Sequence, residues 1–207
     1  MKLQEVLEPE QLDENSLKKA ALAGLASASM FGALNTAKHT PPPPVPPTVQ
    51  QQQEPEPVVD SAAEARQALA QKIASEYRIN PDLAGHIVEL AHKYEKDSFP
   101  TAKDILAVIG IESSFNPNAV SQLKKDPARG LMQVRPGVWG LAPGELKNAE
   151  DQIRIGSDIL HQYYSKLKNK EAALHAYNMG ITNFRKGKHN PRYVAKFARE
   201  LQKYLDI

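Results

Sequence analysis

A run of prolines limits the fold of this 207-residue chain more than any other feature of its sequence. Residues 41–57 read PPPPVPPTVQQQQEPEP. Each proline fixes its own φ and lacks an amide hydrogen, so the stretch cannot form the interior of a helix or a sheet. The sequence therefore predicts an extended, semi-rigid linker over residues 41–60, although the composition would also suit a ligand for a proline-recognising partner.

Residues 1–40, before the linker, combine an acidic start with an apolar segment rich in alanine. Residues 18–37 begin with two lysines and continue as AALAGLASASMFGALNTA. The small residues Ala26, Ser27 and Ala28 would suit a signal-peptide cleavage site, but a secretory signal usually begins basic, whereas this chain begins acidic. The segment is therefore a candidate signal, a candidate membrane anchor or a packed helix.

Charge is distributed unevenly along the chain. Residues 1–60 carry four lysines and eight acidic residues, whereas residues 61–207 carry 22 basic and 16 acidic residues. The basic second part suits an anionic target such as a cell-wall polymer, a nucleic acid or a membrane surface, and it equally suits plain solubility. The absence of cysteine excludes disulfides, thiolate metal sites and a cysteine nucleophile.

Residues 61–207 show helical patterns and no alternating run long enough for a large sheet. Helices are predicted over residues 61–77, from Asn80 and Pro81 past Tyr94, from Ala102 to about Ser113, and over residues 149–167, 170–179 and 191–205. The last of these is expected to turn Val194, Phe197, Leu201 and Leu205 inward. Eight glycines or prolines between the third and fourth helices predict loops and at most a small β-hairpin. The fold class is mainly α.

One glutamate continues an apolar face of the third predicted helix. Positions i, i+3 and i+4 of that face are Ile105, Val108 and Ile109. Glu112 follows at i+7 and lies on the same face. Burial and the negative end of the helix dipole would both raise the pKa of its carboxyl group, as a general acid working near neutral pH requires. A boundary glutamate that reaches solvent is the plainer alternative.

Four blocks of sequence around and after Glu112 keep a fixed order and spacing. They are Glu112-Ser113-Ser114-Phe115-Asn116-Pro117 with Ala119-Val120-Ser121, then Gly130-Leu131-Met132-Gln133-Val134, then Ala176-Tyr177-Asn178-Met179-Gly180, then Arg192-Tyr193-Val194. Together they resemble the signature of the soluble lytic transglycosylases and cover about residues 100–200. The resemblance implies a helical, lysozyme-like catalytic domain of the goose-type lysozyme and transglycosylase kind over residues 61–207.

The resemblance also implies an activity and a catalytic residue. Enzymes of this family cut the β-1,4 bond between N-acetylmuramic acid and N-acetylglucosamine in peptidoglycan and leave 1,6-anhydromuramyl ends. Glu112 matches the family's catalytic glutamate, which acts first as acid on the glycosidic oxygen and then as base on the muramyl 6-hydroxyl. The substrate supplies its own nucleophile, so a second carboxylate is not needed.

Six further residues are expected to bind substrate or to orient the acid. Tyr177 matches the family tyrosine whose hydroxyl contacts the catalytic glutamate, although a half-buried core tyrosine is the alternative. The resemblance gives Met132 a place against a sugar face. The amides of Gln133 and Asn178 would bind acetamido groups and ring hydroxyls.

The other two expected site residues have equally plain structural alternatives. Ser121 stands where the family often has a serine near the cleft, but a serine there also suits a turn. Tyr193 belongs to the last predicted helix, which needs an inward-facing aromatic residue for packing in any case.

The loop between the first two blocks departs from the family pattern and leaves a second mechanism open. Residues 122–129 are longer and more charged than the compact loop typical of the family. Asp126 lies on this loop, 14 residues after Glu112. If it reached the cleft, it would serve as a second carboxylate, and the protein would be a hydrolytic muramidase.

The sequence favours no cofactor, no metal and no nucleic acid as a ligand. The histidines lack the spacing of a metal site. A non-catalytic peptidoglycan-binding module and a basic nucleic-acid-binding protein are the rivals to the enzyme, and the second leaves the four blocks unexplained. We expect action in the periplasm or cell envelope, by a protein exported, anchored through residues 18–37, or carried in a bacteriophage virion.

Overall fold

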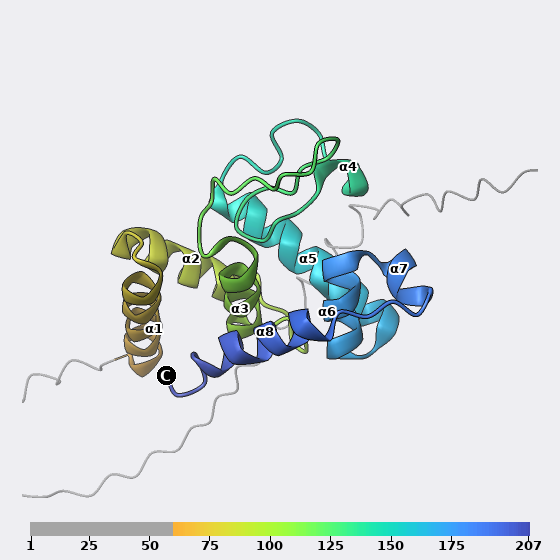
Figure 1. The fold of residues 1–207 in the computed structure, drawn as a ribbon. Coiled ribbons are helices and arrows are strands. Elements are labelled where there is room, and N and C mark those ends of the chain that lie inside the picture. Colours follow the sequence, from red (N-terminus) through yellow and green to blue (C-terminus); the bar gives the residue numbers. More distant parts are fainter. Residues whose placement is uncertain (1–59) are drawn as a thin grey trace, which may run out of the picture. The chain divides into compact units, whose positions relative to one another are not determined.

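A computed structural model describes residues 60–207, which form eight helices joined by turns and one long loop region (Figure 1). The helices are α1 (Ser61–Tyr77), α2 (Pro81–Lys93), α3 (Ala102–Ser113), α4 (Pro136–Trp139), α5 (Ala149–Leu167), α6 (Lys170–Met179), α7 (Ile181–Arg185) and α8 (Pro191–Gln202). The prediction of a mainly α fold is confirmed. The predicted signal or anchor at residues 18–37 and nearly all of the predicted linker lie outside the described residues.

Polar side chains before the first turn fix the starts of the helices. Asp60 accepts hydrogen bonds from the amides of Ala62 and Ala63, so α1 begins where the predicted linker ends. Asn80 caps α2 in the same way. Thr101 and Asp104 form a reciprocal capping box at α3. These caps explain why three helix starts were predictable from the sequence.

Helix α3 is the centre of the domain. Every residue from Ala102 to Gly110 except Lys103 is buried, so the helix is covered on all sides rather than along one stripe. Helix α2 packs against it on one side and α8 on another. Figure 1 shows α3 between α2 and α8, with α5 and α6 beyond. The predicted stripe that leads to Glu112 is therefore part of a fully enclosed helix.

The inward face of α8 differs from the prediction near its end. Tyr193 and Phe197 are buried, and Val194 and Leu201 are partly buried against the core. The prediction that Leu205 faces inward is wrong, since its side chain is 51% exposed and Tyr204 is fully buried instead. The α-helix ends at Gln202, and the chain continues in turns, which breaks the helical spacing that the prediction assumed.

A loop region between α3 and α5 forms the wall above the helices. Its only bridges of β type among the described residues join Val120 to Arg129 and Arg129 to Val134, so the predicted small hairpin is reduced to isolated pairs. The sequence analysis missed the single-turn helix α4 within this region and the short helix α7 after Gly180. Both lie where glycine or proline suggested only loops.

The buried side chain of Gln152, on α5, ties this loop region to the helices. Its Oε1 accepts a hydrogen bond from the amide of Leu131 at 2.9 Å. Its Nε2 donates to the carbonyl of Pro117 at 3.1 Å and to that of Leu146 at 3.0 Å. Three separate points of the loop are therefore held by one side chain, which satisfies its own polar atoms at the same time.

None of the helices within residues 60–207 is both long enough and apolar enough to cross a membrane. Whether residues 18–37 anchor the chain stays a prediction, as does the division into residues 1–40, 41–60 and 61–207.

Replacing Gly156 by alanine should destabilise the protein, because the close packing of α5 on the loop region leaves no room there. An added Cβ would lie 2.4 Å from Sδ and 2.7 Å from Cβ of Met132. We expect the free energy of unfolding to fall by about 1–3 kcal/mol in urea denaturation. Gly85→Ala is the matched control, since α2 has open space at that position and alanine should raise stability by about 0.5–1 kcal/mol. Equal effects of the two substitutions would contradict the packing argument.

Candidate functional site

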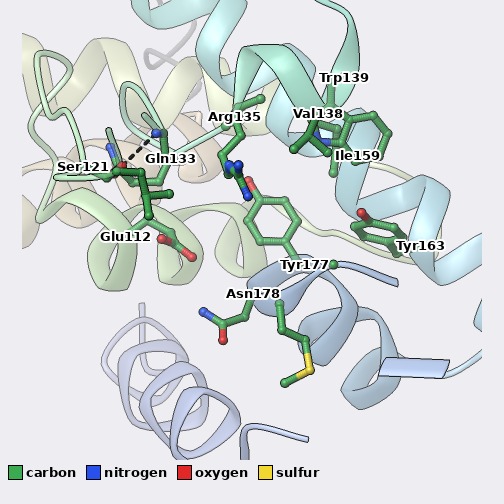
Figure 2. A pocket seen from close by; sticks show the side chains of 15 residues that line it. Glu112, Ser121, Gln133, Arg135, Val138, Trp139, Ile159, Tyr163, Tyr177 and Asn178 are labelled. Carbon is green, nitrogen blue, oxygen red and sulfur yellow. Dashed lines mark hydrogen bonds between the residues drawn. The ribbon is translucent and has the colours of Figure 1, made fainter. Parts of the chain in front are cut away.

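A cleft of about 320 Å³ opens where the end of α3, the loop region, α5 and α6 meet. It is lined by Glu112, Ser121, Leu123, Ala128, Gln133, Val134, Arg135, Val138, Trp139, Ile159, Tyr163, Tyr177, Asn178, Met179 and Gly180. Five of the seven predicted site residues are among them, and Met132 and Tyr193 are not. In the view of Figure 2, Glu112 lies toward one end, and Trp139 and Tyr163 lie toward the other.

Glu112 occupies the last turn of α3, in the surroundings that the sequence suggested. Burial raises the pKa of its carboxyl group from about 4.5 to about 7, while the hydrogen bond from Tyr193 and the charge of Lys196 act in the opposite direction. Its position near the C-terminal end of the helix further disfavours the ionised form. At neutral pH, Glu112 can therefore both give and take a proton.

Tyr193 is the residue that holds the Glu112 carboxyl group. Its hydroxyl donates a hydrogen bond to Oε1 of Glu112 at 2.7 Å. Its ring is buried, and burial together with the nearby charge of Glu112 raises the pKa of its hydroxyl well above the usual value. Tyr193 therefore stays a donor at any working pH. The expectation that Tyr193 packs inward is confirmed, whereas its contact with substrate stays a prediction, since it is not among the residues that line the cleft.

Tyr177 does not make the contact that the family resemblance implied. Its hydroxyl donates instead to the backbone carbonyl of Met132 at 2.8 Å. The residue still lines the cleft near the acid, since the charge of Glu112 adds to burial in raising the pKa of its hydroxyl. The expected tyrosine–glutamate contact exists, but α8 supplies it rather than α6.

The expectation for Met132 is wrong. Its side chain is fully buried and packs against Gly156 of α5, so it offers no surface to a sugar. Gln133 lines the cleft, but its Nε2 donates to the carbonyls of Ala119 and Gly130. Both amide hydrogens are thereby used inside the protein, which leaves Oε1 as the atom that can accept from a ligand.

The remaining two predicted residues lie at the cleft with distinct roles. Ser121 Oγ accepts from the amide of Ala128 at 2.8 Å, so it joins the two ends of the loop rather than forming a local turn, and the residue also lines the cleft. Asn178 is exposed, and its Oδ1 accepts from Nδ2 of Asn190 at 2.8 Å. This contact leaves the amide hydrogens of Asn178 free to point at a ligand's acceptor groups.

Asp126 is not among the residues that line this cleft. Its Oδ1 and Oδ2 accept hydrogen bonds from the amides of Gly137 and Val138 at the start of α4, and Arg135 pairs with it at 3.3 Å. It lines a separate hollow instead. Its contacts are those of a helix cap, and they correct the two-carboxylate alternative.

The far end of the cleft is apolar, and the sequence analysis did not identify it. Val138, Trp139, Ile159 and Tyr163 line it, with the rings of Trp139 and Tyr163 edge to face at 5.7 Å (Figure 2). Val138 is 57% exposed. The only tryptophan of the chain, following a proline and a glycine in a loop, was the signal that could have indicated this surface.

Nothing in the described part of the chain brings three or more potential metal-ligating side chains together. Glu112 is also the only carboxyl group among the residues that line this cleft. The chemistry that these residues offer is therefore proton transfer by one carboxyl group beside an apolar, aromatic wall, which suits the sugar rings of a glycan.

Replacing Glu112 by glutamine should stabilise the protein at high pH but not at low pH. The pKa of the buried carboxyl group, about 7, lies above its ordinary value of 4.5, so folding favours its protonated form. That contribution is complete below pH 4.5 and is lost as the pH rises through 7. We expect the variant's advantage in free energy of unfolding to grow by about 2–3 kcal/mol between pH 5 and pH 8 in urea titrations. An advantage that does not change with pH would contradict a raised pKa.

Comparison with protein families matches residues 89–199, more than half of the chain, to the family described as "Transglycosylase SLT domain". A search among curated proteins returned no match. The match runs from α2 into α8 and includes Glu112 and every residue that lines the cleft. The helical arrangement of residues 60–207 agrees with the lysozyme-like fold of that family. The chain belongs to the transglycosylase SLT domain family and is of the type that acts on peptidoglycan.

Proposed function

We propose that this protein is a lytic transglycosylase that cuts peptidoglycan between N-acetylmuramic acid and N-acetylglucosamine, with Glu112 as its acid and base. The observation that supports this most strongly is one carboxyl group in a sugar-sized cleft with its pKa raised by burial to about 7. Family membership supplies the class of substrate.

In the first step, the protonated Glu112 gives its proton to the glycosidic oxygen as the bond to the muramyl anomeric carbon breaks. The hydrogen bond from Tyr193 stabilises the carboxylate that this leaves behind. Glu112 then takes the proton of the muramyl 6-hydroxyl as that oxygen attacks the anomeric carbon. Glu112 thereby regains the proton that it gave, no water is consumed, and the product carries a 1,6-anhydro ring.

The presence of a single carboxyl group in the cleft favours this route over hydrolysis. A retaining hydrolase needs a second carboxylate as nucleophile, and an inverting one needs it to activate water. Asp126 was the sequence candidate, but both of its oxygens accept hydrogen bonds from the start of α4. An intramolecular hydroxyl replaces both roles at high effective concentration.

The other cleft residues would position the glycan. Asn178 and Oε1 of Gln133 offer polar contacts for acetamido groups, and Trp139 offers an apolar face for a sugar ring. Action in the cell envelope follows from the substrate class. Carriage by a bacteriophage, export and anchoring through residues 18–37 stay predictions.

Incubating the full chain with purified peptidoglycan should release muropeptides that end in 1,6-anhydromuramic acid. Mass spectrometry would show products lighter by one water than those made by a hydrolytic muramidase. Glu112→Gln should lower the rate by at least about a hundredfold, since its amide cannot supply the proton.

Asp126→Asn is the matched control, because it removes a loop carboxylate of similar size outside the cleft. It should weaken the start of α4 and lower stability slightly while leaving the anhydro products unchanged. Reducing muramyl ends that disappear in this variant would instead make the protein a hydrolase. No release by the folded native chain would favour the wall-binding module.

The pH dependence of kcat/KM should show an alkaline limb near neutrality. The first step needs protonated Glu112, and its pKa of about 7 means that the competent fraction falls as the pH rises through 7. The rate on soluble glycan fragments, measured from pH 5 to 9, should therefore fall about tenfold for each pH unit above that limb. A rate that keeps rising to pH 9 would argue against Glu112 as the acid.

A further inference from the structure

A buried carboxylate on α8, outside the lining of the cleft, binds groups from three parts of the domain. Glu200 is only 7% exposed. Its Oε1 accepts hydrogen bonds from the hydroxyls of Tyr77 on α1 and Tyr204 after α8, the latter at 2.7 Å. Its Oε2 accepts from Nζ of Lys203 at 2.8 Å. A charge buried this deeply is tolerated because each oxygen has a donor, and losing one donor is costly.

The same carboxylate lies directly against the backbone of α3. A Cβ added at Gly110 would come within 2.7 Å of Oε1 of Glu200 and 2.8 Å of the hydroxyl of Tyr77. Only glycine lets α8 and α1 approach α3 this closely at that position. Gly110 stands two residues before Glu112, so the contact lies on the last turns of the helix that ends at the acid.

Helix α8 therefore contacts α3 at two points, through two side chains that lie on the same face of α8. Tyr193 and Glu200 are seven residues apart, which is two helical turns. Tyr193 donates a hydrogen bond to Glu112, and Glu200 packs against the backbone at Gly110. Because α8 is a rigid rod over this distance, fixing one point fixes the other.

Tyr77 contacts the acid's helix from a second direction as well. Its ring packs against that of Phe115 with centroids 4.6 Å apart. Phe115 is fully buried and follows Ser114, which ends α3 in the left-handed conformation. Tyr77 thus donates to the carboxylate through which α8 packs on α3, and its ring also packs against the turn immediately after Glu112.

We propose that Glu200 and Tyr77 are positioning residues for the acid, which fix α8 on α3 so that the Tyr193 hydroxyl stays on the Glu112 carboxyl group. Both lie outside residues 89–199, so this device is built from segments that flank the family match. The inference rests on the proposed function, because it assigns a role in positioning the acid of that reaction.

The test compares Tyr77→Phe with Tyr204→Phe in the full chain. Both remove one hydroxyl that donates to Glu200, but Tyr77 joins α1 to α8, whereas Tyr204 is only four residues from Glu200 along the chain. Both should lower the melting temperature. Only Tyr77→Phe should also lower kcat, by about tenfold, with KM unchanged, because the acid is displaced and the substrate contacts are kept.

The pH profile separates positioning from plain stability. Three ionisable groups interact with Glu112: the hydroxyl of Tyr193 and the charge of Lys196 from α8, and the hydroxyl of Tyr177 from α6. Tyr193→Phe removes a donor to the ionised form, so the alkaline limb of kcat/KM should move up by on the order of one pH unit. Tyr77→Phe should move it in the same direction by a smaller amount, and Tyr204→Phe should leave it in place.

A limb that moves with Tyr193→Phe but not with Tyr77→Phe would overturn the proposal and leave the proposed function intact. Activity that survives Glu112→Gln would overturn the function itself, which is a different result. If Tyr77→Phe does not fold, Gly110→Ala probes the same contact, since its Cβ would displace the Glu200 carboxylate. It should shift the limb in the same direction, and an unmoved limb there would equally overturn the proposal.

Discussion

The helix that carries Glu112 is packed on every side, and the cleft takes its chemistry from that enclosure. Since α3 is buried without a break from Asp104 to Gly110, its last turn emerges at the surface of the core with little water around it. A carboxyl group placed there loses hydration before any ligand binds, and its pKa rises to about 7. Because α3 is surrounded by other elements, the side chains that contact Glu112 come from those elements, as the hydrogen bond from Tyr193 of α8 shows.

The hydrogen bond from Tyr193 lowers the pKa of Glu112 and so opposes the effect of lost hydration. Without this donor, burial would raise the pKa of the acid further and leave less of the ionised form at neutral pH. With a stronger donor or a nearby arginine, the acid would be ionised and could not protonate a leaving group. One tyrosine, with the more distant charge of Lys196, keeps both forms accessible. A reaction in which one group acts as acid and then as base needs this balance.

Much of the fold could be read from the sequence, because caps and helical spacing are local signals. The starts of α1, α2 and α3 follow from Asp60, Asn80 and Thr101, and Glu112 was found by continuing an apolar face. The partner of Glu112 was not predictable in the same way. Whether α6 or α8 brings its tyrosine to the acid depends on how two helices are rotated about their axes, which spacing within each helix does not determine.

The errors in the loop region have a similar origin. Met132 looked like a surface for a sugar, but the tight approach of Gly156 draws it into the core. Asp126 was left open as a second carboxylate, but it caps a helix of one turn that no sequence pattern indicated. After α8 ends, the chain no longer keeps the helical spacing of inward-facing residues, so Leu205 is exposed. In each case a contact between distant segments decided the outcome.

The attachment of the long loop region through Gln152 makes one amide group of α5 responsible for where the wall of the cleft lies. Gln152 holds the loop at Leu131, Pro117 and Leu146, three positions far apart along the chain. Between these points the loop carries contacts of its own, such as the pairing of Arg129 with Val120 and with Val134. The wall is therefore a unit with its own internal contacts, and its position on the helices depends on a single side chain.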